Sequence, residues 1–461
     1  MQGYRIEYDS LGEKQVPNDA YYGVQTVRAM ENFVISKTPI SSFPSFIKAL
    51  GYIKKACAIA NLEFKILDAK VAEAIIEASE DVIAGKLDDQ FPVDAIQGGA
   101  GTSVNMNANE VIANRALELM GKDRSAYKTV HPNNHVNLSQ STNDVYPSAI
   151  RIAAHWMLDG LLEEVSRFQA ALKEKGVEFN DVVKMGRTQL QDAIPMTLGM
   201  EFTAWSEAIG EDLERLKVAQ GLLNEINMGA TAIGTGLNAP KGYAEVVTAH
   251  LADLTSLPLY ASQNLVKATQ DSGTFIEISG VLKRIAAKVS KICNDLRLLS
   301  SGPRAGINEI NLPPMQPGSS IMPGKVNPVI PEVMNQIAFD VIGNDLSITM
   351  AAEAGQLELN VMEPLIAYKV FTSINHLRRG LATLTDKCIV GITANREHCR
   401  SMVENSIGII TALVPRLGYE LCAQIAKQAL KTNGSVYTIV LEEGHLRKEE
   451  LDEILSPDSM L

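Results

Sequence analysis

Four segments of the chain combine small, polar and mostly uncharged residues in a way that could bind a small polar ligand. They read QGGAGTSVNMNANE (97–110), HPNNHVNLSQSTND (131–144), GRTQLQD (186–192) and GSSIMPGKVNP (318–328). Hydroxyl, amide and glycine N–H groups supply many hydrogen-bond donors with little positive charge, which suits a carboxylated ligand better than a polyphosphate. A single such cluster is more often a turn or a helix cap. Four of them in one chain favour a binding site, with Arg187 and Lys325 as its charged members.

The glycine-rich segments do not match nucleotide-binding motifs. GSSIMPGKV places five residues between Gly318 and Gly324, where a phosphate-binding loop has four, and Val326 stands where that loop has Ser or Thr. GTGLNA (234–239) follows an amphipathic helical pattern rather than a strand, so we interpret it as a turn between helices. The paired serines of 318–328, flanked by glycines, instead indicate a loop that closes over a substrate ahead of a helix starting near Pro331.

Metal and hydrolase chemistry have little support. His131 and His135 are four residues apart, but Pro132 and two asparagines predict a loop there, so we expect structural histidines. No Ser/His/Asp or Cys/His arrangement stands out in the sequence. We therefore predict no metal and no cofactor.

Long amphipathic helices must position these segments. From Phe275 to Leu299 apolar residues recur every three or four positions, and the same pattern runs from Ile150 to Leu172, after Pro147. Further helices are predicted from near Glu201, after Pro331 and over about 365–388. Strand patterns are short, so we predict an all-α fold with at most minor β-hairpins.

The domain prediction follows from these helices and from changes in composition. We predict three domains: a mainly helical N-terminal domain (1–141), a central five-helix bundle carrying the loop 318–328 (142–396) and a small helical C-terminal domain (397–461).

Composition narrows the class of protein. The 461 residues are 46 % hydrophobic and 21 % charged, which predicts a globular chain. The net charge of −12 argues against nucleic-acid or anionic membrane partners. Five scattered cysteines without a CxxC pair favour a reducing cytoplasm. The first residues lack the apolar core of a signal peptide, and no stretch approaches the roughly 18 apolar residues of a membrane span.

The loop GSSIMPGKVNP resembles the signature loop of the aspartase/fumarase superfamily, and the other polar segments occur in the order typical of that family. The resemblance runs from DSLGEKQVPNDAYYGVQT (9–26) to SIGIITAL (406–413). Its details are most similar to the aspartase branch: YYGVQT (21–26), GGAGTSVNMN (98–107), MGATAIGTGLN (228–238) and MAAEAGQLELNVMEP (350–364). Argininosuccinate and adenylosuccinate lyases share the loop but differ elsewhere.

This resemblance implies reversible elimination of ammonia from L-aspartate to give fumarate through an enediolate. It also implies a homotetramer with a twenty-helix core and active sites shared by three subunits. The matching positions imply Ser319 as the base. The implied ligands are Thr102, Ser141, Thr142 and Ser320 for the β-carboxylate, Lys325, Asn327 and Thr188 for the α-carboxylate, and Asn143 and Gln189 for the amino group.

Gln189 is a departure, because fumarases and some aspartases carry His at this position. Gln cannot relay a proton at neutral pH, which disfavours fumarate hydration without excluding it. A class II fumarate hydratase therefore remains the alternative enzyme. A catalytically silent structural protein is the alternative from another class, because the superfamily includes lens crystallins. Retention of five residues together argues for activity: Ser319, Lys325, Asn327, Thr102 and Thr142.

Overall fold

The computed structural model describes residues 3–455 and residue 459. The chain divides into two compact units, each built from three stretches of sequence. The first unit comprises Met1–Leu162, Glu214–Arg284 and Asp340–His376, and the second comprises Glu163–Leu213, Ile285–Phe339 and Leu377–Leu461. The predicted division into three domains at 141/142 and 396/397 stays a prediction.

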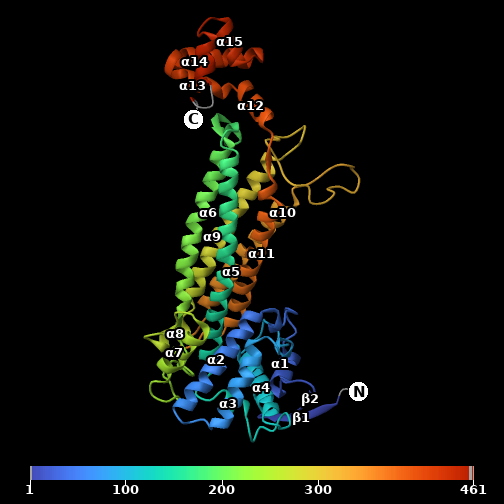
Figure 1. The fold of residues 1–461 in the computed structure, drawn as a ribbon, viewed down its shortest axis with the longest axis vertical. Coiled ribbons are helices and arrows are strands. Elements are labelled where there is room, and N and C mark those ends of the chain that lie inside the picture. The colour runs from blue at the N-terminus through green and yellow to red at the C-terminus, as the bar shows by residue number, and fades with distance from the viewer. Residues whose placement is uncertain (1–2, 456–458, 460–461) are drawn as a thin grey trace. The chain divides into compact units, whose positions relative to one another are not determined.

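Five long helices run through the middle of the described chain, as the apolar spacing predicts (Figure 1). They are α5 (Thr142–Glu178), α6 (Leu198–Gly221), α9 (Gly273–Leu299), α10 (Val329–Glu353) and α11 (Glu363–Lys387). The boundary between the two units falls inside each of these helices. Each of these helices is longer than the roughly 12–15 residues below which an isolated helix is at best marginally stable in water. Its apolar face still needs packing partners.

The start of α5 differs from the sequence prediction. The helix begins at Thr142, and Pro147 lies inside it rather than before it. Proline has no N–H, so the carbonyl of Asn143 loses its helical partner four residues on. Asn227 replaces that partner, because its Nδ2 donates to the Asn143 carbonyl oxygen at 3.0 Å. A contact from a distant segment thus allows the helix to continue across the proline.

The first unit holds shorter helices beside parts of the long ones. They are α1 (Val24–Asn32), α2 (Pro44–Glu63), α3 (Ala69–Ile83), α4 (Thr102–Leu119), α7 (Tyr243–Thr255) and α8 (Leu265–Gln270), with single turns at Ile40–Ser42, Asp88–Gln90 and Leu222–Asn224. Helix α3 packs on both α2 and α4. The core includes Phe46, whose ring meets those of Tyr146 and Phe371 at centroid distances of 5.3 and 5.4 Å.

The segment 131–136 is a short π-helical turn, Pro132–Val136, where the sequence predicts a loop. His131 Nδ1 accepts the backbone N–H groups of Asn133 and Asn134 at 3.0 and 3.3 Å, and His135 Nδ1 accepts the N–H of His131 at 2.9 Å. These ring nitrogens accept the N–H groups at the start of the turn, which begins at Pro132. Both histidines therefore have the structural role that the sequence predicts.

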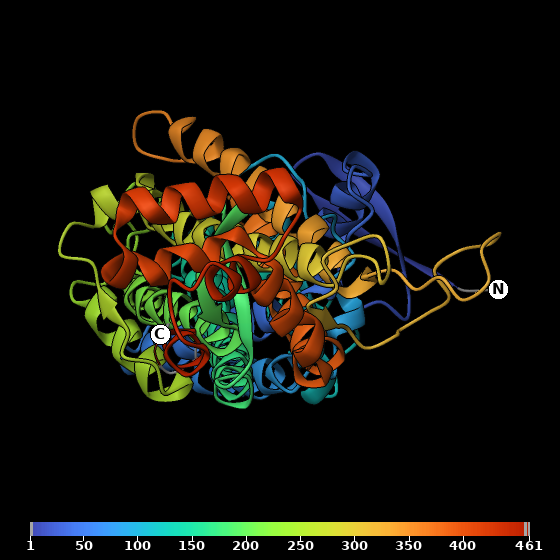
Figure 2. The same ribbon diagram turned by 90° about the horizontal axis from the view of Figure 1, so that it is seen from above.

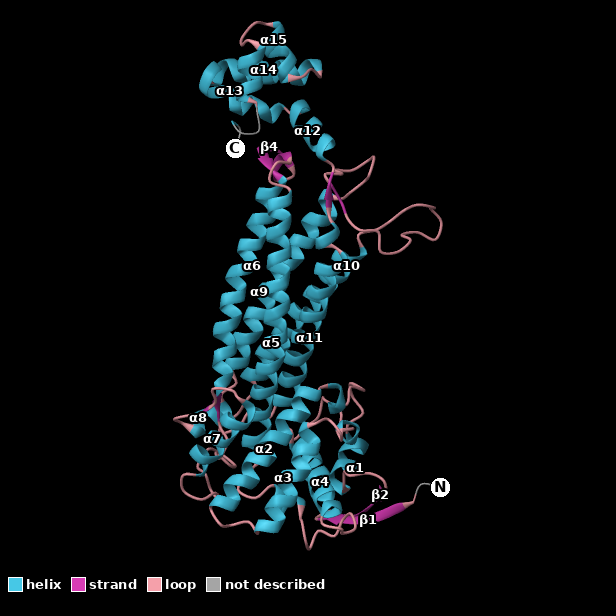
Figure 3. Ribbon diagram, viewed as in Figure 1, coloured by secondary structure: helices cyan, strands magenta, loops and turns pink. Residues whose placement is uncertain are grey.

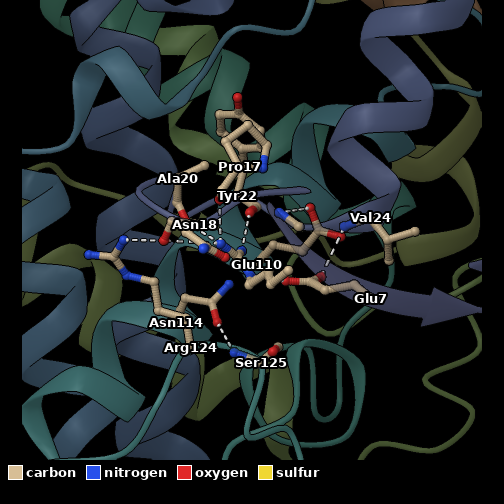
Figure 4. A network of polar contacts seen from close by, with 12 residues as sticks. Glu7, Pro17, Asn18, Ala20, Tyr22, Val24, Glu110, Asn114, Arg124 and Ser125 are labelled. Atoms are coloured by element: carbon tan, nitrogen blue, oxygen red, sulfur yellow. Dashed lines mark hydrogen bonds and ion pairs between the residues drawn. The ribbon is translucent and has the colours of Figure 1, made fainter. Parts of the chain in front are cut away.

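Two buried carboxylates fix the N-terminal segment YYGVQT in the first unit (Figure 4). Glu110 accepts the N–H groups of Gly23, Gln25 and Thr26 and the hydroxyl of Thr26, at 2.6–3.1 Å. Glu7 accepts the N–H of Val24 at 3.0 Å. A Cβ at position 23 would lie 2.5 Å from Glu7 Oε2, so only glycine allows this close approach.

The second unit contains the C-terminal helices α12 (Arg396–Asn405), α13 (Ile410–Leu417), α14 (Tyr419–Thr432), α15 (Val436–Glu442) and α16 (Lys448–Ile454), with single turns at Ile389–Gly391 and Ile407–Ile409. Val183 and Met185 of strand β3 (Val183–Thr188) share a buried apolar cluster with residues of these helices, including Leu413 and Ile425. This cluster attaches the C-terminal helices to the strand that carries the GRTQ segment.

Strands are short and paired only in twos among the described residues (Figure 3). Two pairs are hairpins: β1 (Tyr4–Asp9) with β2 (Gly12–Pro17), and β3 (Val183–Thr188) with β4 (Gln191–Thr197). The other two join distant segments and are not hairpins: the parallel pair β5 (Glu225–Ile226) and β6 (Tyr260–Ala261), and the antiparallel pair β7 (Ile310–Asn311) and β8 (Thr393–Ala394). The all-α prediction is confirmed. No helix in the described ranges is long and apolar enough to cross a membrane.

Candidate active site

The predicted site residues fall into both units. Thr102, Ser141, Thr142 and Asn143 belong to the first unit, and Thr188, Gln189, Ser319, Ser320, Lys325 and Asn327 belong to the second. Each group is described within its own unit.

In the first unit, two predicted segments lie at the starts of helices. Thr102 is the first residue of α4 and Thr142 is the first residue of α5. Gly101 precedes α4 with φ +88°, and a Cβ there would lie 2.3 Å from the Tyr146 ring, so this turn requires glycine. Asn105, one turn into α4, donates from Nδ2 to Thr142 Oγ1 at 3.1 Å. The unit therefore brings segments 97–110 and 131–144 together.

Hydrogen bonds fix the positions of Ser141 and Asn143. Ser141 Oγ accepts the N–H of Asn143 at 3.2 Å, which is the hydrogen bond of a helix N-cap. Asn143 Nδ2 donates to the carbonyl of Ala232 at 2.7 Å. That contact orients the Asn143 amide, whose Oδ1 accepts no hydrogen bond from the described residues. An oxygen acceptor with a fixed orientation suits a substrate ammonium group.

Asp144 is a further residue of this site, and the sequence reasoning did not assign it a role. Its carboxylate is buried and accepts the backbone N–H of Ser141 at 3.0 Å and that of Thr231 at 2.9 Å. Burial raises the pKa of Asp144 to about 7, against the opposing effect of these hydrogen bonds and of the Lys54 charge. The residue fastens the segment MGATAIGTGLN (228–238) to the start of α5, and this segment overlaps the turn predicted at 234–239.

In the second unit, Thr188 and Gln189 lie at the exposed tip of the β3–β4 hairpin. Gln189 and Leu190 form its two-residue turn with φ of 55° and 62°. Such a turn normally uses Asn-Gly, because other residues are strained in the left-handed region. The backbone therefore holds Gln189 in a conformation that its side chain does not favour.

A buried ion cluster supports this hairpin. Arg187 Nη1 donates to Glu309 Oε1 at 2.6 Å, and Lys184 Nζ lies 2.8 Å from Glu309 Oε2. Glu309 is fully buried and Lys184 is almost so. Burial alone would lower the pKa of Lys184. The carboxylates of Glu201 and Glu309 outweigh that effect and raise the pKa above its usual range. No local sequence signal identifies Glu309, which lies 122 residues from Arg187.

The loop 318–328 stands clear of the helices of its unit (Figures 1 and 2). Ser320 and Lys325 are exposed, whereas Ser319 and Asn327 are half-buried. The loop base is closed by the N–H of Gly318, which donates to the Lys325 carbonyl at 2.7 Å, and by Asn327 Nδ2, which donates to the Gly318 carbonyl at 2.8 Å. One amide hydrogen of Asn327 is left for a ligand.

Ser319 occupies a distinctive position in this loop. Its Oγ accepts two backbone N–H groups, from Ile321 at 3.2 Å and from Met322 at 2.9 Å. Backbone donors aimed at one oxygen stabilise negative charge on it, as in an oxyanion hole. A serine can act as a base only if its alkoxide is stabilised, and these two N–H groups point at the atom that would carry the charge.

Comparisons with known proteins identify the family to which this chain belongs. A lyase family model matches residues 12–343, and a model of the fumarase C C-terminus matches residues 409–461. The chain is 57 % identical to aspartate ammonia-lyase of Pseudomonas aeruginosa over 99 % of this chain and 97 % of that protein. It is 55 % identical to the Helicobacter pylori aspartate ammonia-lyase, over 99 % and 98 % of the two chains.

Solved structures show the same fold. A fumarate lyase:delta crystallin from Brucella melitensis bound to cobalt has a TM-score of 0.96 and 52 % identity, covering 99 % of both chains. Class II fumarase from Schistosoma mansoni has a TM-score of 0.94 and 35 % identity, again covering 99 % of both chains. Matching family models, curated relatives and folds agree, so this chain belongs to the aspartase/fumarase superfamily of lyases.

Proposed function

We propose that this protein is an aspartate ammonia-lyase, which converts L-aspartate reversibly to fumarate and ammonia. The observation that carries this proposal is 53–57 % identity, over nearly the full length, to curated aspartate ammonia-lyases. The fumarase comparison supports the alternative less well, at 35 % identity. Gln189, at the tip of the hairpin, also lacks the proton-relay capacity of histidine.

In the proposed mechanism, Ser319 removes the proton from the carbon next to the β-carboxylate. The β-carboxylate then becomes a dianionic enediolate, so catalysis requires donors that bind this group more strongly in the transition state than in the substrate. We assign Thr102, Ser141, Thr142 and Ser320 to that task. The two N–H groups that reach Ser319 Oγ favour its alkoxide form.

The remaining residues would orient the substrate. Lys325, Asn327 and Thr188 would bind the α-carboxylate, with the ammonium of Lys325 as the charge partner. Asn143 and Gln189 would bind the amino group, and the free Oδ1 of Asn143 suits that role. Loss of ammonia from the enediolate then gives fumarate.

The test is an assay of purified protein with L-aspartate and, separately, with L-malate, following fumarate by ultraviolet absorbance. We expect fumarate from L-aspartate. Turnover of L-malate alone would establish the fumarate hydratase, and turnover of neither substrate would favour a catalytically silent structural protein.

We also propose a homotetramer whose subunits share active sites. Helix α10 supports this proposal, because Phe339, Ile342, Leu346 and Met350 recur at three- and four-residue spacing and are 63, 38, 63 and 64 % exposed. A continuous apolar stripe of this kind is typical of an interface. Light scattering should give the mass of four chains, and a monomeric mass would contradict the proposal.

For localisation, we propose the cytoplasm. All five cysteines are free and buried, which fits a reducing compartment. Fractionation of cells expressing the native gene should recover the protein with cytoplasmic markers, and recovery in an exported fraction would contradict this.

A further inference from the structure

A lysine ammonium is buried beneath the first turn of α5. Lys54 lies on α2 and its side chain is fully buried. Its Nζ donates to three amide oxygens: Asn105 Oδ1 at 2.7 Å, Gln140 Oε1 at 2.8 Å and Asn137 Oδ1 at 3.2 Å. Each of the three ammonium hydrogens thus has an acceptor. Burial of an ammonium still costs several kcal/mol, so a position that needed only packing would be better filled by an apolar residue.

Lys54 determines which way the Asn105 amide faces. Because the oxygen of this amide faces the ammonium, its nitrogen must face the opposite side. Asn105 Nδ2 donates there to Thr142 Oγ1 at 3.1 Å and to Asn137 Oδ1 at 3.1 Å. The reversed amide would place N–H groups against the ammonium and leave Thr142 facing an oxygen. The Lys54 Nζ, which donates to the amide oxygens around it, therefore selects one orientation of the Asn105 amide.

This orientation determines how the Thr142 hydroxyl is used. A hydroxyl has one hydrogen to donate and lone pairs to accept. Since Thr142 Oγ1 accepts from Asn105, its own hydrogen is directed elsewhere, and it donates to none of the residues that the structure describes. A carboxylate accepts hydrogen bonds and cannot donate them, so it is the natural partner for that hydrogen.

We propose that Lys54 and Asn105 are positioning residues: Lys54 orients the Asn105 amide, and Asn105 makes Thr142 present its hydroxyl hydrogen to the substrate β-carboxylate. The inference rests on the proposed function, which assigns Thr142 to that carboxylate. Neither positioning residue contacts the substrate in this scheme, and both act through Thr142.

The test is a double-mutant cycle between Asn105→Asp and Thr142→Val. The introduced carboxylate can only accept, so it should capture the Thr142 hydrogen and reverse the bond. We expect Asn105→Asp to lower kcat by about 10- to 100-fold, with a smaller change in KM. Such a loss approaches the one caused by removing a single hydrogen-bond donor to the transition state. In the Thr142→Val background, which has no hydroxyl to orient, the same change should alter kcat by less than about threefold.

Two further variants and a control complete the design. Asn105→Leu removes the donor without adding charge, and Lys54→Met removes the ammonium. Both variants should lower kcat when Thr142 is present and have little effect in the Thr142→Val background. If one of the variants fails to fold, the others still test the inference. Asn114→Asp is the control, because Asn114 is also a buried asparagine of α4 but bonds to Tyr21 and Tyr127 instead. It should leave kcat unchanged.

Equal losses of kcat in both backgrounds would overturn the inference, since Asn105 would then act through general destabilisation or charge. Calorimetric binding of fumarate to the same proteins separates this result from failure of the proposed function. If the unmodified protein does not deaminate L-aspartate, but Asn105→Asp weakens fumarate binding only when Thr142 is present, the proposed function fails and the positioning role stands. Equal weakening in both backgrounds would reject the positioning role.

Discussion

Replacing Glu309 by glutamine should destabilise the second unit more than the loss of any exposed ion pair. The carboxylate is fully buried and lies 2.6 Å from Arg187 Nη1 and 2.8 Å from Lys184 Nζ. Breaking a buried pair costs about 3–5 kcal/mol, because the remaining charge is left uncompensated. Lys184 keeps its contact with Glu201 at 2.6 Å, so we expect the lower end, about 3 kcal/mol for Glu309→Gln.

The assay is urea unfolding at a fixed protomer concentration, because subunit association contributes to the apparent stability of an oligomer. The matched control is Asp386→Asn, which breaks the exposed Arg167–Asp386 pair of the same unit, 2.6 Å long. We expect the control to cost less than about 1 kcal/mol. A loss for Glu309→Gln no larger than that of the control would refute the reasoning. KM for L-aspartate should also rise, since Arg187 precedes Thr188 on the hairpin.

Three other predictions concern the loop and the hairpin tip. Ser319→Ala should lower kcat by about two to four orders of magnitude without loss of helical circular dichroism; a near-normal kcat would exclude Ser319 as the base. Lys325→Arg should raise KM for L-aspartate on the order of tenfold, because a planar guanidinium replaces a compact ammonium; an unchanged KM would argue against contact with the α-carboxylate. Leu190→Gly should raise stability by roughly 0.5–1 kcal/mol, because glycine relieves the left-handed strain at this exposed position; a lower melting temperature would contradict this.

The long helices could be predicted from the sequence because their signal is local. The apolar spacing from Phe275 to Leu299 matches α9, which spans Gly273–Leu299. The predicted start of α5, after Pro147, was wrong by several residues. A proline normally interrupts a helical pattern, so the sequence gives no reason to extend the helix before it. The contact from Asn227, 84 residues away, satisfies the carbonyl that Pro147 leaves without its helical donor, and no local pattern reveals it.

The candidate site could be predicted only in part. Motif resemblance identified residues that would face the substrate, such as Ser319 and Thr142, whose assignments stay predictions. The residues that support them gave no signal: Lys54 reads as an ordinary helical lysine, and Glu309 as one more acidic residue. Their roles depend on contacts across 51 and 122 residues, and neither spacing nor propensity encodes such distances.

The interrupted hydrogen bond at Pro147 also limits how this site can be transplanted. Residues 141–148 form the first turns of a helix, but the carbonyl of Asn143 is satisfied from outside that helix. A designed scaffold that copied only this peptide would reproduce the side chains while leaving the carbonyl of Asn143 unpaired. Such a graft must therefore include Asn227, and with it the loop that carries Thr231 and Ala232. The smallest part of this structure that could be transferred to another scaffold is therefore a pair of segments rather than a single helix.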